Sequence, residues 1–109
     1  MQFNPVDTKL YLQVLDVTWT WDPAKATANF RKHGVSFALA QRVFNDPFSL
    51  TRRDPFRDEE RWQTVGMPFA GSPGVLLVVH TDQDGEGGRV ISARKATAPE
   101  RKAYEKGEF

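Results

Sequence analysis

Residues 20–37 read TWDPAKATANFRKHGVSF, and this stretch decides how the fold begins. Asp22 followed by Pro23 predicts a helix start, because an aspartate accepts hydrogen bonds from the free amides of the first turn and proline fits the first helical position. Gly34 predicts the end of that helix after His33, because glycine readily takes the left-handed conformation of a C-terminal cap. We therefore expect a first helix from Pro23 to His33.

This first helix has little apolar surface. Ala26 and Phe30 form only a narrow apolar stripe, whereas Asn29 and His33 stand four residues apart and share a polar face. We expect that polar face to meet a ligand.

A second helix is expected over residues 37–45, with Ser36 as its N-terminal cap and Asp46-Pro47 after its end. Its apolar side chains recur at helical spacing, which predicts the main core helix: Phe37, Leu39, Ala40, Val43 and Phe44.

The rest of the chain predicts a sheet and a last helix. Strands are expected over residues 48–52, 61–67, 75–81 and 89–95, and the third is apolar on both faces and should be central. Thr97 and Glu100 form a capping box that opens a helix ending near Gly107. We therefore expect an α+β domain: an antiparallel sheet of about four strands, with two N-terminal helices and a short C-terminal helix packed on one face.

The side chains of the last expected strand, residues 89–95, should alternate between the two faces of the sheet. Ile91 and Ala93 should point to the core, because strand residues alternate sides. That places Ser92 and Arg94 on the other face of the sheet, which should be partly free.

The length of the chain, 109 residues, predicts one domain. The absence of cysteine excludes a disulfide scaffold and thiolate metal sites, and it fits a reducing cytoplasm. No run approaches the ~20 apolar residues of a membrane span, and we expect no secretory signal. His33 and His80 lie 47 residues apart and make a poor metal site, so we expect neither metal nor cofactor.

Positive charge gathers in two segments although the net charge is only +1. Residues 89–106 carry six Lys or Arg against two Glu, a balance of +4, and residues 22–34 carry three against one Asp, a balance of +2. A basic surface on a near-neutral protein fits a polyanionic partner. The alternative is that these side chains only solvate a small domain.

Two arginines are candidates for binding a phosphate. Arg94 should stand at a strand end on the partly free face, where its planar fork could pair with two phosphate oxygens; alternatively it is a plain exposed arginine. Arg61 opens another strand, although it could instead form a local ion pair with Glu60. Both could stabilise the negative charge that develops when a phosphodiester is cleaved.

His33, His80 and Tyr104 are further candidates. Imidazole is the side chain whose ordinary pKa lies near 7, which suits proton transfer. His33 could equally be a helix C-terminal cap, and a strand histidine such as His80 is often buried and hydrogen-bonded. Tyr104 could stack on a base or donate to a phosphate, or it could anchor a helix that has few apolar residues.

The motifs follow one another along the chain in a set order: Trp21-Asp22-Pro23 with Lys25, Asn29, Lys32-His33-Gly34-Val35, Phe37, Phe44 with Asp46-Pro47, Glu60-Arg61-Trp62 with Gly66, Ile91-Ser92-Ala93-Arg94-Lys95-Ala96, and Glu100-Arg101 with Tyr104. In this combination the chain resembles the BrnT-type toxins of bacterial toxin–antitoxin pairs, which share the RelE/ParE-like ribonuclease fold. Such toxins usually begin just before the Trp-Asp pair. We therefore expect a single toxin-like domain over residues 19–109 and an N-terminal extension over residues 1–18, either an added strand or a loose arm.

The resemblance implies a cytoplasmic, metal-independent endoribonuclease that arrests growth by cleaving RNA through attack of the 2′-hydroxyl. It also implies neutralisation by a small antitoxin of ribbon–helix–helix type (BrnA-like), in a 2:2 complex that reaches operator DNA only through the antitoxin. The expected catalytic residues are Arg94, Arg61, His33, His80 and Tyr104, and the expected RNA contacts are Lys25, Lys32, Lys95 and Arg101. The alternative is a non-catalytic module that only binds an antitoxin, an operator complex or nucleic acid.

Overall fold

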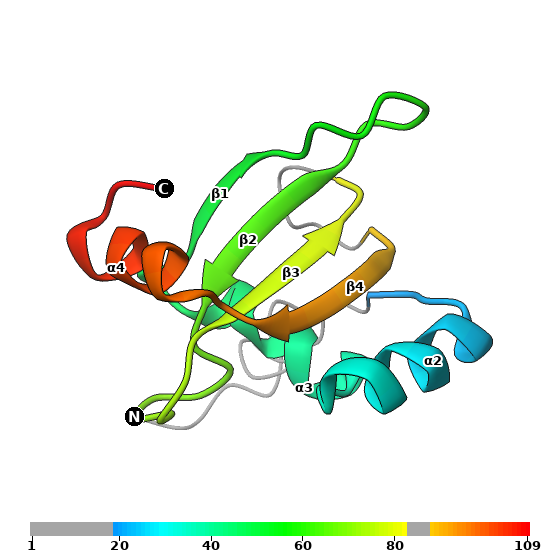
Figure 1. The fold of residues 1–109 in the computed structure, drawn as a ribbon, viewed down its shortest axis with the longest axis horizontal. Helices are drawn as coiled ribbons and strands as arrows, with labels where there is room; N and C mark the ends of the chain where they lie inside the picture. Colours follow the sequence, from blue (N-terminus) through cyan, green and yellow to red (C-terminus); the bar gives the residue numbers. More distant parts are fainter. Residues whose placement is uncertain (1–18, 83–87) are drawn as a thin grey trace, which may run out of the picture.

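The computed structural model describes residues 19–82 and 88–109, so the expected N-terminal extension, residues 1–18, lies outside the described residues. The elements follow one another as α2 (Pro23–His33), α3 (Phe37–Ala40), the 3-10 helix η1 (Gln41–Asn45), β1 (Leu50–Arg53), β2 (Trp62–Gly66), β3 (Leu76–His80), β4 (Val90–Lys95) and α4 (Ala98–Lys106) (Figure 1). Within the described ranges, no helix combines the length and the apolar character that a membrane crossing requires.

The local signals for helix ends are confirmed. α2 has the expected bounds: Asp22 accepts a hydrogen bond from the N–H of Ala24 at 2.9 Å, and Gly34 has a φ of 70° at the C-terminal cap. α4 begins with the expected capping box, in which Thr97 and Glu100 each bond the other's backbone N–H.

Residues 37–45 form one turn of α-helix followed by η1, rather than one continuous α-helix. Ser36 caps α3 through Oγ, which accepts from the N–H of Leu39 at 3.0 Å. The tighter 3-10 form is common where a helix ends. The segment still supplies buried core side chains, as its spacing predicted: Phe37, Ala40 and Val43.

The four strands form one antiparallel sheet in the order β1-β2-β3-β4. β2 and β3 are therefore central, which confirms the expectation for the third strand. Before α2, Thr20 forms an isolated parallel bridge with Arg89, at the start of β4.

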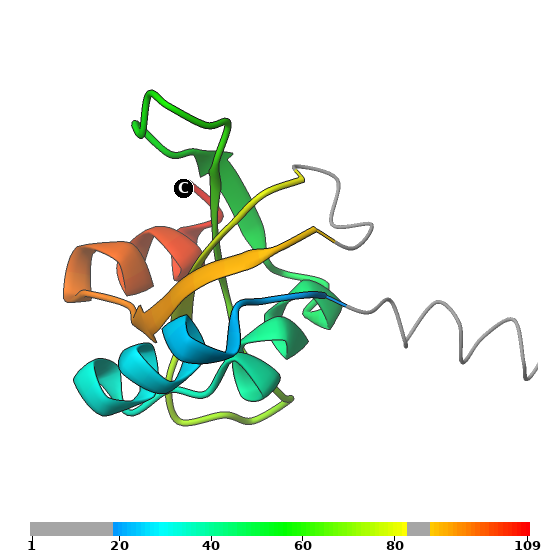
Figure 2. The same ribbon diagram turned by 90° about the vertical axis from the view of Figure 1, so that its right-hand side faces the viewer.

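The sheet has two faces, and each is covered by different helices. On the α3 face, Leu76 and Val78 of β3 pack beneath α2, α3 and η1. On the α4 face, Leu77 packs with Val65 and with Tyr104 of α4. Figure 2 shows α4 (orange) and the α3–η1 segment (teal) on different sides of the strands. The expectation that all helices pack on one face is therefore wrong, because α4 returns across the opposite side.

A β-bulge changes which β4 side chains enter the core. Val90 and Ala93 face the α3 side, instead of the expected pair Ile91 and Ala93. The β3–β4 register shifts beside His80, which pairs with Val90 whereas the preceding residue pairs with Ser92. Ile91 is the extra residue of this bulge, and regular alternation could not reveal it.

Asn29 is a structural residue and not part of an exposed ligand-binding face. Its side chain is 8% exposed, and Nδ2 donates to the carbonyls of Val35 at 3.1 Å and Ala93 at 2.8 Å. Phe30, expected to pack inward, is 55% exposed. α2 therefore contacts β4 through the buried side-chain amide of Asn29. The hydrogen bonds of this amide hold the helix against the strand, in place of the broad apolar stripe that α2 lacks.

Candidate nucleic-acid interface

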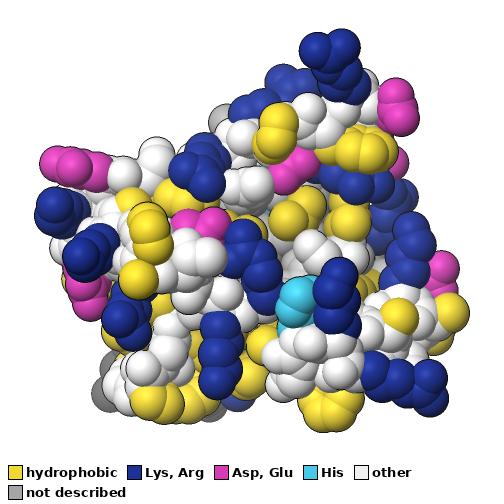
Figure 3. All heavy atoms as spheres, viewed as in Figure 1, with side chains coloured by type: hydrophobic (Ala, Val, Ile, Leu, Met, Phe, Trp, Pro, Cys, Tyr) yellow, Lys and Arg dark blue, Asp and Glu magenta, His cyan; other side chains and the backbone are white. Residues whose placement is uncertain are grey.

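Within the described ranges, α4 covers one end of the α4 face of the sheet, and the side chains at the other end are only half-buried. Alternation from the paired residues places half-buried side chains on the open floor and arginines around it: Gln63, Val79 and Ser92, with Arg52, Arg61, Arg89 and Arg94. We call this surface the arginine face. Figure 3 shows Lys and Arg side chains around a recessed area over the sheet, with hydrophobic side chains at its base.

Arg94 lies on this face, as expected, near the C-terminal end of β4 and opposite Leu77. Its Nη1 and Nη2 donate to the two carboxylate oxygens of Glu100 at 2.7 and 3.0 Å. The hydrogen bonds with Glu100 raise the pKa of Arg94, and those with Arg94 lower the pKa of Glu100 to about 2. Both groups therefore stay charged at neutral pH.

The ion pair leaves one edge of the Arg94 guanidinium unused. An arginine has five N–H donors, and Arg94 directs three of them to Glu100 and to the carbonyl of Lys95. Within residues 19–82 and 88–109, no acceptor bonds the Nε proton or the second Nη2 proton, and these two protons lie side by side. With 35% of the side chain exposed, this second fork is open to an anion.

Arg61 belongs to a separate cluster at the other end of the sheet. Its Nε donates to Glu59 at 3.2 Å and not to the expected Glu60. Arg89 Nη2 donates to both oxygens of Glu59 at 2.7 and 2.8 Å, and these hydrogen bonds lower the pKa of Glu59. Arg61 Cζ also lies 3.7 Å from the ring centre of Phe56.

Arg61 and Arg94 do not converge on one phosphate. Arg94 pairs with Leu77, and Leu77 pairs with Val65 of β2. Val65 is four residues after Arg61, which corresponds to roughly 13 Å along a strand. The register therefore places the two candidate phosphate-binding arginines at different ends of the sheet, each with its own carboxylate partner.

His33 lies toward the same end of β4 as Arg94. α2 runs along β4: Thr20, just before the helix, bridges Arg89 at the start of β4, and Asn29 bonds Ala93 near its end. His33 is one helical turn beyond Asn29 and on the same side of α2. Its side chain is half-buried, so the imidazole remains accessible beside the sheet.

His80 is enclosed in the core on the α3 face and is fully buried. Its Nδ1 lies 2.9 Å from the carbonyl of Thr81 and must donate to it, so Nε2 accepts from the Thr64 hydroxyl at 2.7 Å. The rings of Trp19 and Phe44 flank the imidazole. Burial lowers the pKa of His80. These contacts match the structural alternative, and the ring does not reach the arginine face.

Tyr104 likewise has the contacts of an anchor. It is 9% exposed, and its hydroxyl donates to Asp46 Oδ2 at 2.6 Å. Burial and the hydrogen bond to Asp46 raise the pKa of Tyr104 to about 12. The phenol therefore holds its proton and ties α4 to the end of η1.

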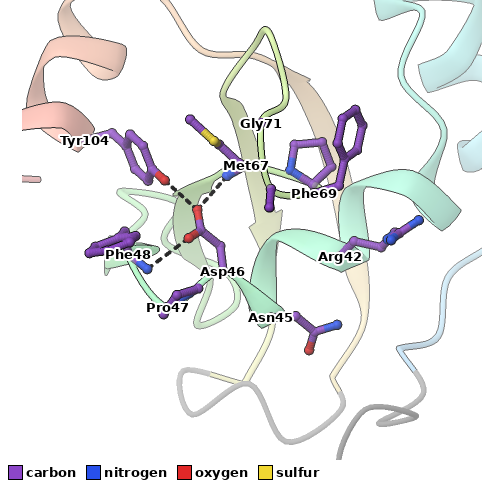
Figure 4. A pocket seen from close by; sticks show the side chains of 11 residues that line it. Arg42, Asn45, Asp46, Pro47, Phe48, Met67, Phe69, Gly71 and Tyr104 are labelled. Atoms are coloured by element: carbon purple, nitrogen blue, oxygen red, sulfur yellow. Dashed lines mark hydrogen bonds between the residues drawn. The ribbon is translucent and has the colours of Figure 1, made fainter.

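Asp46 lies beside a separate hollow of about 490 Å³ (Figure 4). Its carboxylate also accepts from the N–H groups of Met67 at 2.7 Å and Phe48 at 2.9 Å. Burial opposes ionisation, but these hydrogen bonds and that of Tyr104 lower the pKa of Asp46 on balance. The carboxylate already accepts three hydrogen bonds, and the hollow is lined by exposed apolar side chains, with Phe48 72% exposed and Phe69 45% exposed.

The four lysines and arginines expected to contact RNA are all exposed: Lys25 and Lys32 on α2, Lys95 at the end of β4 and Arg101 on α4. Lys95 follows Arg94 and so points to the other side of the strand. In the part of the chain that the structure describes, no three His, Asp or Glu side chains are grouped to hold a metal ion.

Sequence reasoning missed Arg52. Its Nε donates to Gln63 at 2.8 Å, Gln63 donates to Asp54 at 2.7 Å, and Arg52 Cζ lies 4.0 Å from the ring centre of Phe109. Arg52 thus bonds a neutral amide and, among the described residues, takes part in no ion pair. Only the β1–β2 register, which places Arg52 opposite Gln63, brings it to the arginine face.

The arginine face offers guanidinium groups at both ends of a half-buried floor, with an imidazole near one end. Such an arrangement can bind successive phosphates of an extended strand, since each guanidinium pairs with phosphate oxygens. It can also stabilise charge that develops on a phosphorus held beside Arg94.

Comparison with known proteins agrees with this chemistry. Residues 21–100 match the model of the family described as the ribonuclease toxin, BrnT, of type II toxin–antitoxin systems. The fold is similar to the crystal structure of the Brucella abortus ribonuclease toxin, BrnT, with 26% sequence identity and a TM-score of 0.52 over 73% of this chain and 96% of that chain. No curated protein sequence matches. The family match spans most of the domain, and the chain therefore belongs to the BrnT family of ribonuclease toxins of type II toxin–antitoxin systems.

Proposed function

We propose that this toxin is a metal-independent endoribonuclease that holds the scissile phosphate with Arg94. The observation that supports this proposal is the second donor pair of Arg94, its Nε proton and its second Nη2 proton. Glu100 fixes the guanidinium at the end of β4, while the Nε and Nη2 protons remain available for two phosphate oxygens. A positioned cation of this kind loses little when the transition state forms, because its orientation is set in advance.

In the proposed reaction, the 2′-hydroxyl oxygen of the RNA attacks the adjacent phosphorus and its proton passes to a base. The bond from phosphorus to the 5′-oxygen breaks, and the 5′-oxygen takes a proton from an acid. The products are a 2′,3′-cyclic phosphate and a 5′-hydroxyl end. His33 is the proton-transfer group that the geometry favours, because it is the accessible imidazole toward the Arg94 end of β4.

The remaining arginines would bind flanking nucleotides. Arg61 and Arg89 lie at the end of the sheet that is opposite Arg94, and Arg52 lies along the side. A strand of RNA running across Gln63, Val79 and Ser92 would meet these cations in turn. This part of the proposal predicts salt-dependent binding, since each phosphate contact releases a counterion.

We further propose that a small antitoxin protein of ribbon–helix–helix type neutralises the toxin in a 2:2 complex in the cytoplasm and connects it to operator DNA. The type II family assignment supports a protein partner. Covering the arginine face would suffice to block RNA, because the proposed catalytic and binding groups share that surface.

The test is cleavage of a synthetic RNA by the purified chain in the presence of EDTA. Wild type should cleave it, and Arg94→Ala should lose roughly 10²-fold or more in rate. Arg94→Lys should remain strongly impaired, because an ammonium cannot form the same fork. Arg53→Ala, which changes an arginine on the opposite sheet face, is the matched control and should retain activity. A folded wild-type protein that binds RNA but leaves it intact would instead be a binding module.

A further inference from the structure

The two edges of the sheet differ in how their backbone groups are used. Along β4, the Asn29 side chain bonds both the N–H and the carbonyl of Ala93, and the carbonyl of Thr20 accepts from the N–H of Val90. Along β1, every residue after Leu50 is exposed. Among the described residues, the edge along β4 is therefore closed and the edge along β1 is open.

The pairing of β1 with β2 identifies the open backbone groups. The N–H of Asp54 donates to the carbonyl of Arg61 at 2.9 Å, so these two residues form a hydrogen-bonded pair of the antiparallel ladder. Such pairs alternate along a ladder. Arg52 therefore directs its backbone groups to β2, whereas Thr51 and Arg53 direct theirs outward. Within residues 19–82 and 88–109, neither Thr51 nor Arg53 has a backbone hydrogen-bond partner on that outer side.

The open edge carries positive charge. The exposed side chains of β1 are Thr51, Arg52 and Arg53. The carboxylate of Asp54, the next residue along the chain, accepts from Gln63 and from the N–H of Phe56, and among the described residues neither Arg52 nor Arg53 takes part in an ion pair. Backbone donors and acceptors flanked by two guanidinium groups are suited to an extended peptide with acidic side chains.

A second copy of the chain fits this edge poorly. Antiparallel pairing of two β1 strands would bring the adjacent Arg52 and Arg53 of one copy against the same residues of the other. Like charges on facing strands are destabilising, and basic side chains on an edge strand are a known device against self-association. The charge of the edge therefore favours a different, acidic partner.

We propose that β1 is a docking edge for an extended acidic segment of a partner protein, which adds as a further strand through the outward backbone groups of Thr51 and Arg53. Phe48, 72% exposed and two residues before β1, would contact an apolar residue of the same segment. The docking contacts are the backbone groups of β1, so the proposal does not depend on whether the arginine face cleaves RNA, although Arg52 borders both surfaces.

The probe is a short synthetic peptide that alternates valine and glutamate, with a control peptide in which every glutamate is replaced by lysine. Both are titrated into the ¹⁵N-labelled full chain at low salt and followed through backbone amide signals. The acidic peptide should shift the amides of Thr51 and Arg53, and the lysine peptide should not. The proposal is overturned if millimolar acidic peptide leaves both amides unmoved, or if both peptides shift them equally.

A pair of variants separates the backbone contact from the charge. Arg53→Ala and Arg53→Pro both remove the guanidinium, but only proline removes the outward N–H, and proline is tolerated on the open side of an edge strand. Arg53→Pro should bind the acidic peptide about tenfold more weakly than Arg53→Ala, the effect of losing one hydrogen bond. Equal affinities in folded variants would contradict strand addition.

If Arg53→Pro does not fold, Arg53→Glu tests the docking edge instead. It should weaken the acidic peptide and strengthen the lysine peptide, and no change in preference would rule out the charged edge as the determinant. Arg53 points to the α3 face, so RNA cleavage should persist in all these variants. A wild-type protein that binds the acidic peptide but does not cleave RNA would contradict the proposed ribonuclease activity and leave the docking edge supported.

Discussion

The side chain of Asn29 and the backbone of Ala93 are joined by two reciprocal hydrogen bonds, although the residues are 64 positions apart in the chain. Nδ2 donates to the Ala93 carbonyl at 2.8 Å, and Oδ1 accepts from the Ala93 N–H at 3.2 Å. The amide thus takes the place of a neighbouring strand at the edge of β4. It also sets the position of α2, and with it that of His33, relative to the strand that carries Arg94.

Asn29→Ala should lower the free energy of unfolding by about 2–4 kcal/mol, because it leaves two buried backbone groups of Ala93 without partners. Urea denaturation measures this change. Lys25→Ala, an exposed substitution on the same helix, should stay within about 0.5 kcal/mol of wild type. Equal stability of the two variants would show that α2 is held by other contacts.

Tyr104→Phe should lower the free energy of unfolding by about 1.5–3 kcal/mol, because Asp46 loses a hydrogen bond to its charged carboxylate. The ring remains to pack with Val65 and Leu77, so the fold should persist. RNA cleavage at a temperature well below the midpoint of unfolding should be nearly unchanged. A large loss of cleavage with little loss of stability would instead mean that the phenol contacts the substrate.

Glu100→Gln should remove a pH dependence of stability. The pKa of Glu100 is lowered from 4.5 to about 2 in the folded protein, so its ionised form favours folding. This contribution is fully present above pH 4.5 and is lost as the pH falls toward 2. The free energy of unfolding, measured by denaturation at several pH values between 4.5 and 2, should decrease less steeply with falling pH in the variant than in wild type.

The same variant tests how Arg94 is positioned. Without the carboxylate, the guanidinium keeps its charge but loses its two-point anchor, so cleavage of RNA should decrease while RNA binding changes little. Glu105→Gln, a charge change elsewhere on α4, is the control. Unchanged cleavage in Glu100→Gln would show that Arg94 does not depend on this orientation.

His80 should make stability fall as the pH drops below its ordinary pKa. Burial lowers the pKa of His80 from 6.5, so the unfolded chain binds a proton more readily than the folded one. Its contribution to stability is complete above pH 6.5 and is lost as the pH decreases through the lowered pKa.

His80→Gln keeps a side chain that can both donate and accept but removes the titration. Unfolding free energies measured between pH 7 and pH 5 should have a smaller slope in His80→Gln than in His33→Gln, which retains the buried imidazole. A similar slope in both variants would assign the pH dependence to other groups.

The helix boundaries could be predicted from the sequence because capping depends on residues within one turn. Asp22, Gly34 and Thr97 each act on backbone groups a few positions away. The bulge at Ile91 and the return of α4 across the other face could not be predicted in this way, because both depend on how distant segments pack.

For the candidate site, sequence alone determined that Arg94 lies on the face opposite to Ala93, since two residues in alternation need no knowledge of the rest of the chain. Only the tertiary structure decided that Arg61 stands at the far end of the sheet, that Glu59 rather than Glu60 binds it, and that His80 is enclosed. Strand register and burial arise from contacts between residues far apart in the chain, and a local pattern carries no information on which of those contacts form.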